Sequence, residues 1–62
     1  MYVYENAEDF IYNFLADNGQ DTERISDTGT VDNLREKGFT LEDISKGRVP
    51  DQTILDNIVW LY

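Results

Sequence analysis

The chain has 62 residues, no cysteine, no histidine and a net charge of −8, which excludes disulfides, thiolate zinc sites and histidine-based catalysis. Its length predicts one small domain that buries only about 60% of its unfolded surface, so helix packing, a homodimer or a partner must add stability. Its 40% of hydrophobic residues distinguish it from a disordered acidic tail.

A first helix is predicted between Asn6, which can cap it, and the stop signal Asn18-Gly19. Asp9 follows the cap by three residues, as in a capping box. Apolar residues then recur at helical spacing and predict one buried stripe. The stripe comprises Ala7, Phe10, Ile11, Phe14 and Leu15.

Residues 18–30 are polar and rich in turn-forming residues, and they are long for a connection inside a small domain. Ile25 is expected to anchor their middle. A short strand over residues 23–26, paired with an N-terminal strand at residues 2–4, is an alternative, although two short strands are marginal on their own.

A second helix is predicted over Val31–Lys37, with Thr30 as its cap and Gly38 as its end. Val31 and Leu34 should face inward, and Phe39 should plug the turn that follows.

Two further helices complete the predicted fold. Thr40 and Asp43 can form a capping box for a short third helix that ends at Gly47. Residues 50–51 should begin a fourth helix, which would leave Trp60 on its polar side. The apolar stripe of this helix comprises Ile54, Leu55, Ile58, Val59 and Tyr62.

The predicted fold is therefore mainly α: a small single domain of three to four short helices over residues 1–62, with a short N-terminal β-strand as an optional addition. The expected core comprises Phe10, Ile11, Phe14, Leu15, Leu34, Phe39, Leu41, Ile44, Ile54, Leu55 and Ile58. No segment reaches the ~20 apolar residues of a membrane span, and the N-terminus lacks the pattern of a signal peptide. We expect a cytoplasmic protein.

Two short motifs suggest chemistry that the rest of the chain does not support. Residues 27–30 read D-T-G-T, as in aspartic proteases, but those enzymes need two such aspartates in β-rich lobes. Residues 17–23 resemble a calcium loop, yet Gly19, Thr22 and Thr28 occupy positions that require other residues. We therefore expect no catalytic residue, no metal and no cofactor.

Residues 34–44, LREKGFTLEDI, resemble the L-R-x-x-G-F-[ST]-L-x-[DE]-I segment of MerR-type helix-turn-helix regulators. Residues 47–61 are loosely similar to the last helix junction of repressor-type domains. The resemblance implies a helix–glycine–aromatic–helix joint. A protein that binds duplex DNA also neutralises several phosphates with basic side chains. The bases of this chain are Arg24, Arg35, Lys37, Lys46 and Arg48.

The charge is concentrated in the first half of the chain. Residues 1–34 carry a net charge of −7, and residues 35–62 carry −1. Such a field repels nucleic acid and anionic membranes and attracts basic surfaces, although an ordinary solvated face is an equally weighted interpretation. The candidate partner-binding residues are Glu5, Glu8, Asp9, Tyr12, Asp17, Asp21, Glu23, Asp27, Asp32 and Trp60.

In size, charge and lack of histidine and cysteine, the chain resembles the small acidic inhibitors, including DNA mimics, that bacteriophages encode for host takeover. The resemblance implies a non-enzymatic protein that occludes a basic, nucleic-acid-binding host protein. The alternative is an adaptor module that binds a protein through Phe39, Trp60 and Tyr62. A degenerate, dimeric helix-turn-helix regulator is the third hypothesis.

Overall fold

A computed structural model describes residues 6–61 of the chain, and helices account for most of them. The elements are α1 (Ala7–Asp17), the 3-10 helix η1 (Thr22–Arg24), β1 (Ile25–Ser26), α2 (Asp27–Glu36), α3 (Leu41–Ser45), α4 (Asp51–Asp56) and β2 (Val59–Trp60). The predicted mainly α fold is confirmed. The N-terminal strand suggested at residues 2–4 lies outside the described residues.

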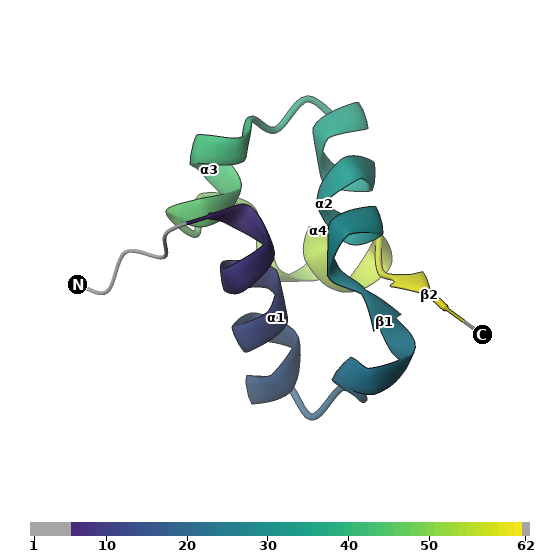
Figure 1. Ribbon diagram of the computed structural model, residues 1–62. Coiled ribbons are helices and arrows are strands. Elements are labelled where there is room, and N and C mark those ends of the chain that lie inside the picture. The colour runs from purple at the N-terminus through teal and green to yellow at the C-terminus, as the bar shows by residue number, and fades with distance from the viewer. Residues whose placement is uncertain (1–5, 62) are drawn as a thin grey trace.

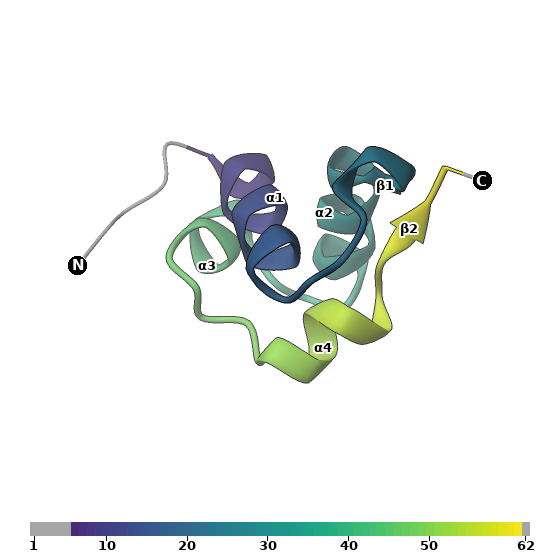
Figure 2. The ribbon, with the colours of Figure 1, turned by 90° about the horizontal axis from the view of Figure 1, so that it is seen from below.

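The helices α1 and α2 lie side by side and run in opposite directions (Figure 1). α3 packs against the N-terminal half of α1, and α4 crosses behind the pair (Figures 1 and 2). β1 and β2 form a two-stranded antiparallel sheet at the edge of the molecule. In Figure 1, α1 and its connection to β1 therefore form the front and lower part of the molecule, α3 lies at the top, α4 at the back and β2 at the right-hand edge.

The core contains most of the apolar residues that helical periodicity assigns to it. Ile11, Leu15, Leu34, Ile44 and Ile54 are completely buried, and Phe10, Phe14, Phe39, Leu55 and Ile58 pack against them while half-buried. The prediction for Leu41 is wrong, because this residue is 49% exposed at the rim of an open hollow. α3 has five residues, and one of them, Ile44, reaches the core. Val49, which no helical pattern identifies, is buried.

Local caps begin α1 and α3 as predicted. The side chain of Asn6 accepts a hydrogen bond from the backbone N–H of Asp9 (2.8 Å). Thr40 and Asp43 form a reciprocal capping box, with N···O distances of 3.1 and 3.3 Å. Gly47, with a φ of 71°, follows α3 in the left-handed conformation that glycine adopts without a steric penalty.

α2 begins four residues earlier than its sequence predicts. Its cap is Ser26, whose side chain accepts a hydrogen bond from the N–H of Gly29 (2.9 Å). The predicted cap, Thr30, instead lies inside the helix and is completely buried. The D-T-G-T motif is thus the first turn of a helix, which agrees with neither a protease loop nor a cap at Thr30.

The prediction that the fourth helix continues toward the C-terminus is also wrong. α4 ends at Asp56, and Val59 and Trp60 form β2, in which Trp60 pairs with Ile25 and Val59 with Ser26. The N–H of Leu61 donates to the carbonyl oxygen of Arg24 (2.8 Å). A strand near residues 23–26 therefore exists, but its partner is C-terminal.

Side chains of α2 hold the segment that contains β2. The hydroxyl of Thr30 accepts a hydrogen bond from the N–H of Val59 (3.0 Å) and donates to the carbonyl oxygen of Ser26 (2.8 Å). The hydroxyl thereby links β2 to β1 through a side chain of α2. The side-chain amide of Asn33 donates to the carbonyl oxygen of Asn57 (3.3 Å). We call residues 57–61 the C-terminal strap.

Gly29 lets the C-terminal strap approach α2 closely. A Cβ atom at this position would lie 2.9 Å from Ser26 Oγ and 3.0 Å from a methyl carbon of Val59. Replacing a helical glycine with alanine ordinarily stabilises a helix by about 1 kcal/mol. Here we expect Gly29→Ala to destabilise the protein by about 1–3 kcal/mol, because overpacking outweighs that gain.

Urea unfolding checks this prediction, with Thr28→Ala in the same exposed turn as the control. Thr28→Ala should change stability by no more than about 0.5 kcal/mol. An unfolding midpoint that rises in Gly29→Ala would show that the strap does not restrict this position.

Candidate functional site

The outward face of α1 carries the first part of the candidate acidic surface. Asp9 and Tyr12 are exposed there, opposite the buried stripe of the helix, and the side chain of Tyr12 is 50% exposed. Asp17 is exposed at one flank of this face. Glu8 is half-buried at the flank of this face. The acids are spread along the helix, since Asp9 and Asp17 lie about 12 Å apart at 1.5 Å per residue.

The second part surrounds the connection between α1 and α2, at the lower end of Figure 1. Asp21 and Glu23 are exposed, and the side chain of Asp21 accepts a hydrogen bond from the N–H of Glu23 (3.2 Å). Asp27 is half-buried at the start of α2, and its carboxylate accepts a hydrogen bond from the N–H of Thr28 (2.9 Å). With Asp17 at the end of α1, four carboxylates therefore lie around one chain connection.

We define the acidic band as the α1 face and this connection together. Its described members are Glu8, Asp9, Tyr12, Asp17, Asp21, Glu23 and Asp27. Of the other predicted site residues, Asp32 lies farther along α2, where it lines a hollow between α2 and α3. Glu5 lies outside the described residues.

The two halves of the described chain differ in how their acids are paired with cations. Lys46 Nζ lies 2.7 Å from Glu42 Oε1, and Arg48 Nη1 lies 3.6 Å from Asp43 Oδ1. The acidic band has one pair over residues 6–61, between Arg24 and Asp21, with an N···O distance of 3.4 Å. Its other carboxylates have no cationic partner within that part of the chain, so their charge faces solvent uncompensated.

The paired acids of α3 titrate differently from ordinary carboxyl groups. The pKa of Glu42 lies below its ordinary value of 4.5, mainly because Lys46 donates a hydrogen bond to it and carries a positive charge. The pKa of Asp43 lies below 3.8, mainly because it accepts a hydrogen bond from the N–H of Thr40. Both acids stabilise α3 in their charged form.

The stability that these acids supply should depend on pH. A carboxylate whose pKa is lower in the folded state contributes fully above its unfolded value, and its contribution falls as the pH drops through that value toward the lowered one. For Asp43 the loss therefore begins near pH 3.8. We expect Asp43→Asn to be less stable than the parent at about pH 7, and we expect this difference to shrink at about pH 3. Urea unfolding at both pH values measures this; an equal difference at both would contradict it.

A shallow hollow of about 550 Å³ lies at the joint between α2 and α3. Its lining includes Arg35 and the half-buried Phe39, together with the carboxylates of Asp32 and Glu36. Two carboxylates and one guanidinium give this lining a net charge of −1, which does not favour the phosphates of DNA. Residues 34–44 form a joint between two helices, as their resemblance to helix-turn-helix regulators implies, but the hollow beside this joint has a single basic side chain in its lining.

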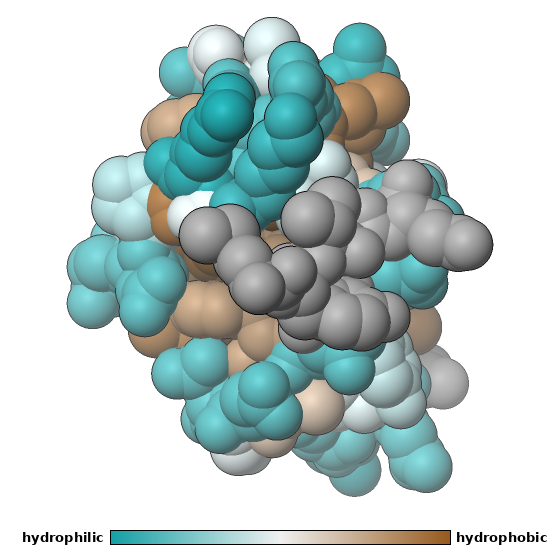
Figure 3. Space-filling model, turned by 90° about the vertical axis from the view of Figure 1, so that its left-hand side faces the viewer, coloured by the Kyte–Doolittle hydropathy of each residue, from teal (hydrophilic) through white to brown (hydrophobic). Residues whose placement is uncertain are grey.

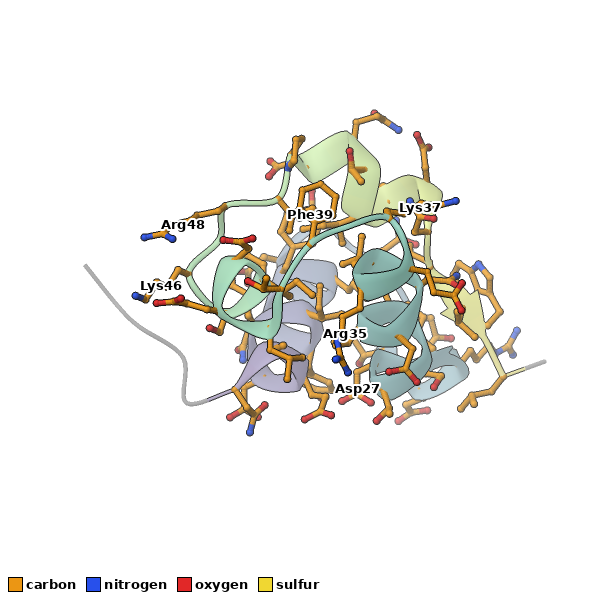
Figure 4. The ribbon with its side chains drawn as sticks, turned by 90° about the horizontal axis from the view of Figure 1, so that it is seen from above. Asp27, Arg35, Lys37, Phe39, Lys46 and Arg48 are labelled. Carbon is orange, nitrogen blue, oxygen red and sulfur yellow. The ribbon has the colours of Figure 1, made fainter. Side chains whose placement is uncertain are left out.

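The cations of the second half do not form one basic surface. Figure 4 shows Lys46 and Arg48 pointing outward beside α3, Arg35 between α1 and α2, and Lys37 on the opposite side of the view. Seen from the side of α3 and α1, hydrophilic residues dominate the periphery, with apolar residues in smaller areas between them (Figure 3). A protein surface that follows a DNA backbone needs clustered lysine and arginine side chains, and the cations of this half are dispersed instead.

Trp60 lies on β2, which corrects its predicted position on the polar side of the fourth helix. It is 49% exposed, and the next residue, Leu61, is 57% exposed. Pairing with β1 brings both residues beside η1 and thus next to the acidic band. Sequence periodicity misses Leu61 because it assigns this segment to a helix. Phe39, proposed with Trp60 as an adaptor contact, packs against the core, and Tyr62 lies outside the described residues.

Comparison with protein-family models, curated proteins and solved structures finds no match for this chain. Within residues 6–61, no helix combines the length and apolar character needed to cross a bilayer. The same residues contain no group of three or more acids placed to hold a metal ion.

Proposed function

We propose that this protein is a non-enzymatic acidic binding protein that inhibits or modulates a basic, nucleic-acid-binding partner by covering its surface. One observation carries the proposal. The carboxylates of the acidic band are mostly exposed, and apart from Asp21 they lack a cationic partner in the described structure. Acids of the second half, in contrast, are neutralised in part by Lys46 and Arg48.

The mechanism is occlusion. Exposed carboxylates of the band replace the phosphates that the partner normally binds, and long-range attraction steers the two proteins together. Tyr12 adds an amphipathic contact in the middle of the α1 face, of the kind enriched at interfaces. The proposal places the protein in the cytoplasm, in a bacterial host if a phage encodes it, where it needs no cofactor.

A pull-down from bacterial lysate tests the proposal. The tagged protein is washed at salt concentrations from about 0.05 M to about 0.5 M, over which the Debye length falls severalfold. Captured proteins are identified by mass spectrometry, and the main one is purified and tested in competition with duplex DNA. We expect a basic protein that is lost at high salt and displaced by DNA. A captured partner that stays bound at high salt and is not displaced by DNA would contradict occlusion by the acidic band.

An adaptor function is the second candidate, because the consecutive apolar residues Trp60 and Leu61 are both about half exposed. An exposed tryptophan is a favoured anchor of protein interfaces. Binding through it would tolerate salt and fail in Trp60→Ala, so the same pull-down separates the two functions. The dispersed cations give the helix-turn-helix hypothesis no comparable support.

A further inference from the structure

The outer edge of β2 is open. The N–H groups of Val59 and Leu61 point inward, to the Thr30 hydroxyl and to the carbonyl oxygen of Arg24. Since backbone groups alternate along a strand, the N–H and C=O of Trp60 point to the opposite edge. In the described structure no other element lies beyond that edge (Figures 1 and 2). One donor and one acceptor are therefore available at a single residue.

β2 has two residues, and a short edge strand is one protection against unwanted pairing, but this edge lacks the other protective features. Protected edges carry charges or proline, or they are covered by another element. Residues 57–61 read N-I-V-W-L, with no charge and no proline, and two large apolar residues at their end are about half exposed. In a chain of net charge −8, an uncharged edge lets two copies meet without bringing carboxylates directly together.

We infer that β2 is a self-association site, at which it pairs antiparallel with β2 of a second copy across a two-fold axis at Trp60. The geometry is self-complementary, because the N–H of Trp60 in each copy donates to the C=O of its counterpart. The two short sheets become one sheet of four strands in the order β1–β2–β2–β1. A two-stranded sheet and a small domain are each marginally stable on their own, and the four-stranded sheet of the dimer stabilises both. The contact is isologous and closes at the dimer.

Salt distinguishes this contact from binding through the acidic band. Two copies of charge −8 repel each other, so screening should strengthen the dimer. The proposed complex with a basic partner has opposite charges and should weaken under the same conditions. The failure of one proposal therefore does not imply the failure of the other.

Analytical ultracentrifugation of the untagged protein tests the inference, from about 5 µM to about 500 µM at low and high salt. We expect a monomer–dimer equilibrium that shifts toward dimer with concentration and salt. Emission from Trp60, the single tryptophan of the chain, should move to shorter wavelength in parallel. A protein that remains monomeric at the highest concentration and salt overturns the inference.

Matched variants locate the contact. Trp60→Lys and Leu61→Lys place a charge on the open edge and should each weaken the dimer at least about tenfold. Tyr12→Lys is the control, because Tyr12 is 50% exposed, as Trp60 nearly is, but lies on α1. Circular dichroism confirms that each variant remains helical. A dimer that survives both strap substitutions, or is lost equally in Tyr12→Lys, would overturn the assignment to β2.

Discussion

Replacing Asp9, Asp17 and Asp21 with lysine is expected to reduce binding of the basic partner at least about 100-fold, since like charges placed opposite each other cost several kcal/mol. Asp9 and Asp17 are exposed, and neither carboxylate has an ion pair in the described structure. The helical fold should persist, because no described core contact depends on these side chains. Titration calorimetry or fluorescence anisotropy with the purified partner measures the change.

A matched variant separates position from total charge. Glu36→Lys, Asp51→Lys and Asp56→Lys raise the net charge of the chain by the same amount but lie on α2 and α4. Asp51 begins α4 and Asp56 ends it, much as Asp9 and Asp17 stand near the two ends of α1, so effects on helix ends are similar. The control should weaken binding only modestly. Equal losses in both variants would mean that the partner responds to overall charge, and the acidic band would not be the binding site.

Thr30→Val is expected to lower the free energy of unfolding by about 1–3 kcal/mol, the usual cost of leaving a buried hydrogen-bonding group without its partner. The substitution keeps the shape of the side chain but removes the hydroxyl that accepts from the N–H of Val59 and donates to the carbonyl of Ser26. Thr30 is completely buried, so water does not replace the hydroxyl without rearrangement. Urea unfolding measures the loss.

Thr30→Ser provides the matched control, because it keeps the hydroxyl and removes a methyl group. Hydrogen exchange at the Val59 amide distinguishes the two variants even if their stabilities are similar. The amide should exchange faster in Thr30→Val, relative to core amides, and stay protected in Thr30→Ser. Unchanged stability and unchanged protection in Thr30→Val would show that the hydroxyl does not hold the strap.

The parts of the fold that local sequence signals determine were predictable. α1 and α3 begin at caps whose hydrogen bonds span three residues, and the stop after α3 needs only the left-handed glycine at position 47. Such signals operate within one turn of chain. The buried stripe of α1 follows from periodicity for the same reason.

The start of α2 could not be decided locally, because Ser26 and Thr30 are both suitable caps. Thr30 lies in the helix because its hydroxyl meets the N–H of Val59, which is distant in sequence. The end of α4 was missed for a similar reason. Apolar residues continue the helical spacing to Tyr62, but pairing with β1 draws Val59 and Trp60 into a strand. Long-range pairing overrides the weaker propensities of short segments.

The acidic surface was predictable in composition but only partly in arrangement. Six of its described carboxylates lie along α1 and the connection to α2, as their positions in the chain suggest. Asp32 does not join them, because it lines the hollow beside Arg35. The proximity of Trp60 to this surface depends on the β1–β2 pairing, which a helical interpretation of residues 51–62 excludes.

The bonds that hold the C-terminal strap also bear on the order of folding. The contacts of Thr30 with Val59 and of Asn33 with Asn57 join residues 29 and 24 positions apart in the chain. Closing such loops has an entropic cost that contacts within and between neighbouring helices largely avoid. The strap would then dock after the transition state, on helices already packed. Damage to it would raise the unfolding rate and leave the folding rate almost unchanged, so the strap would determine how long each molecule stays folded.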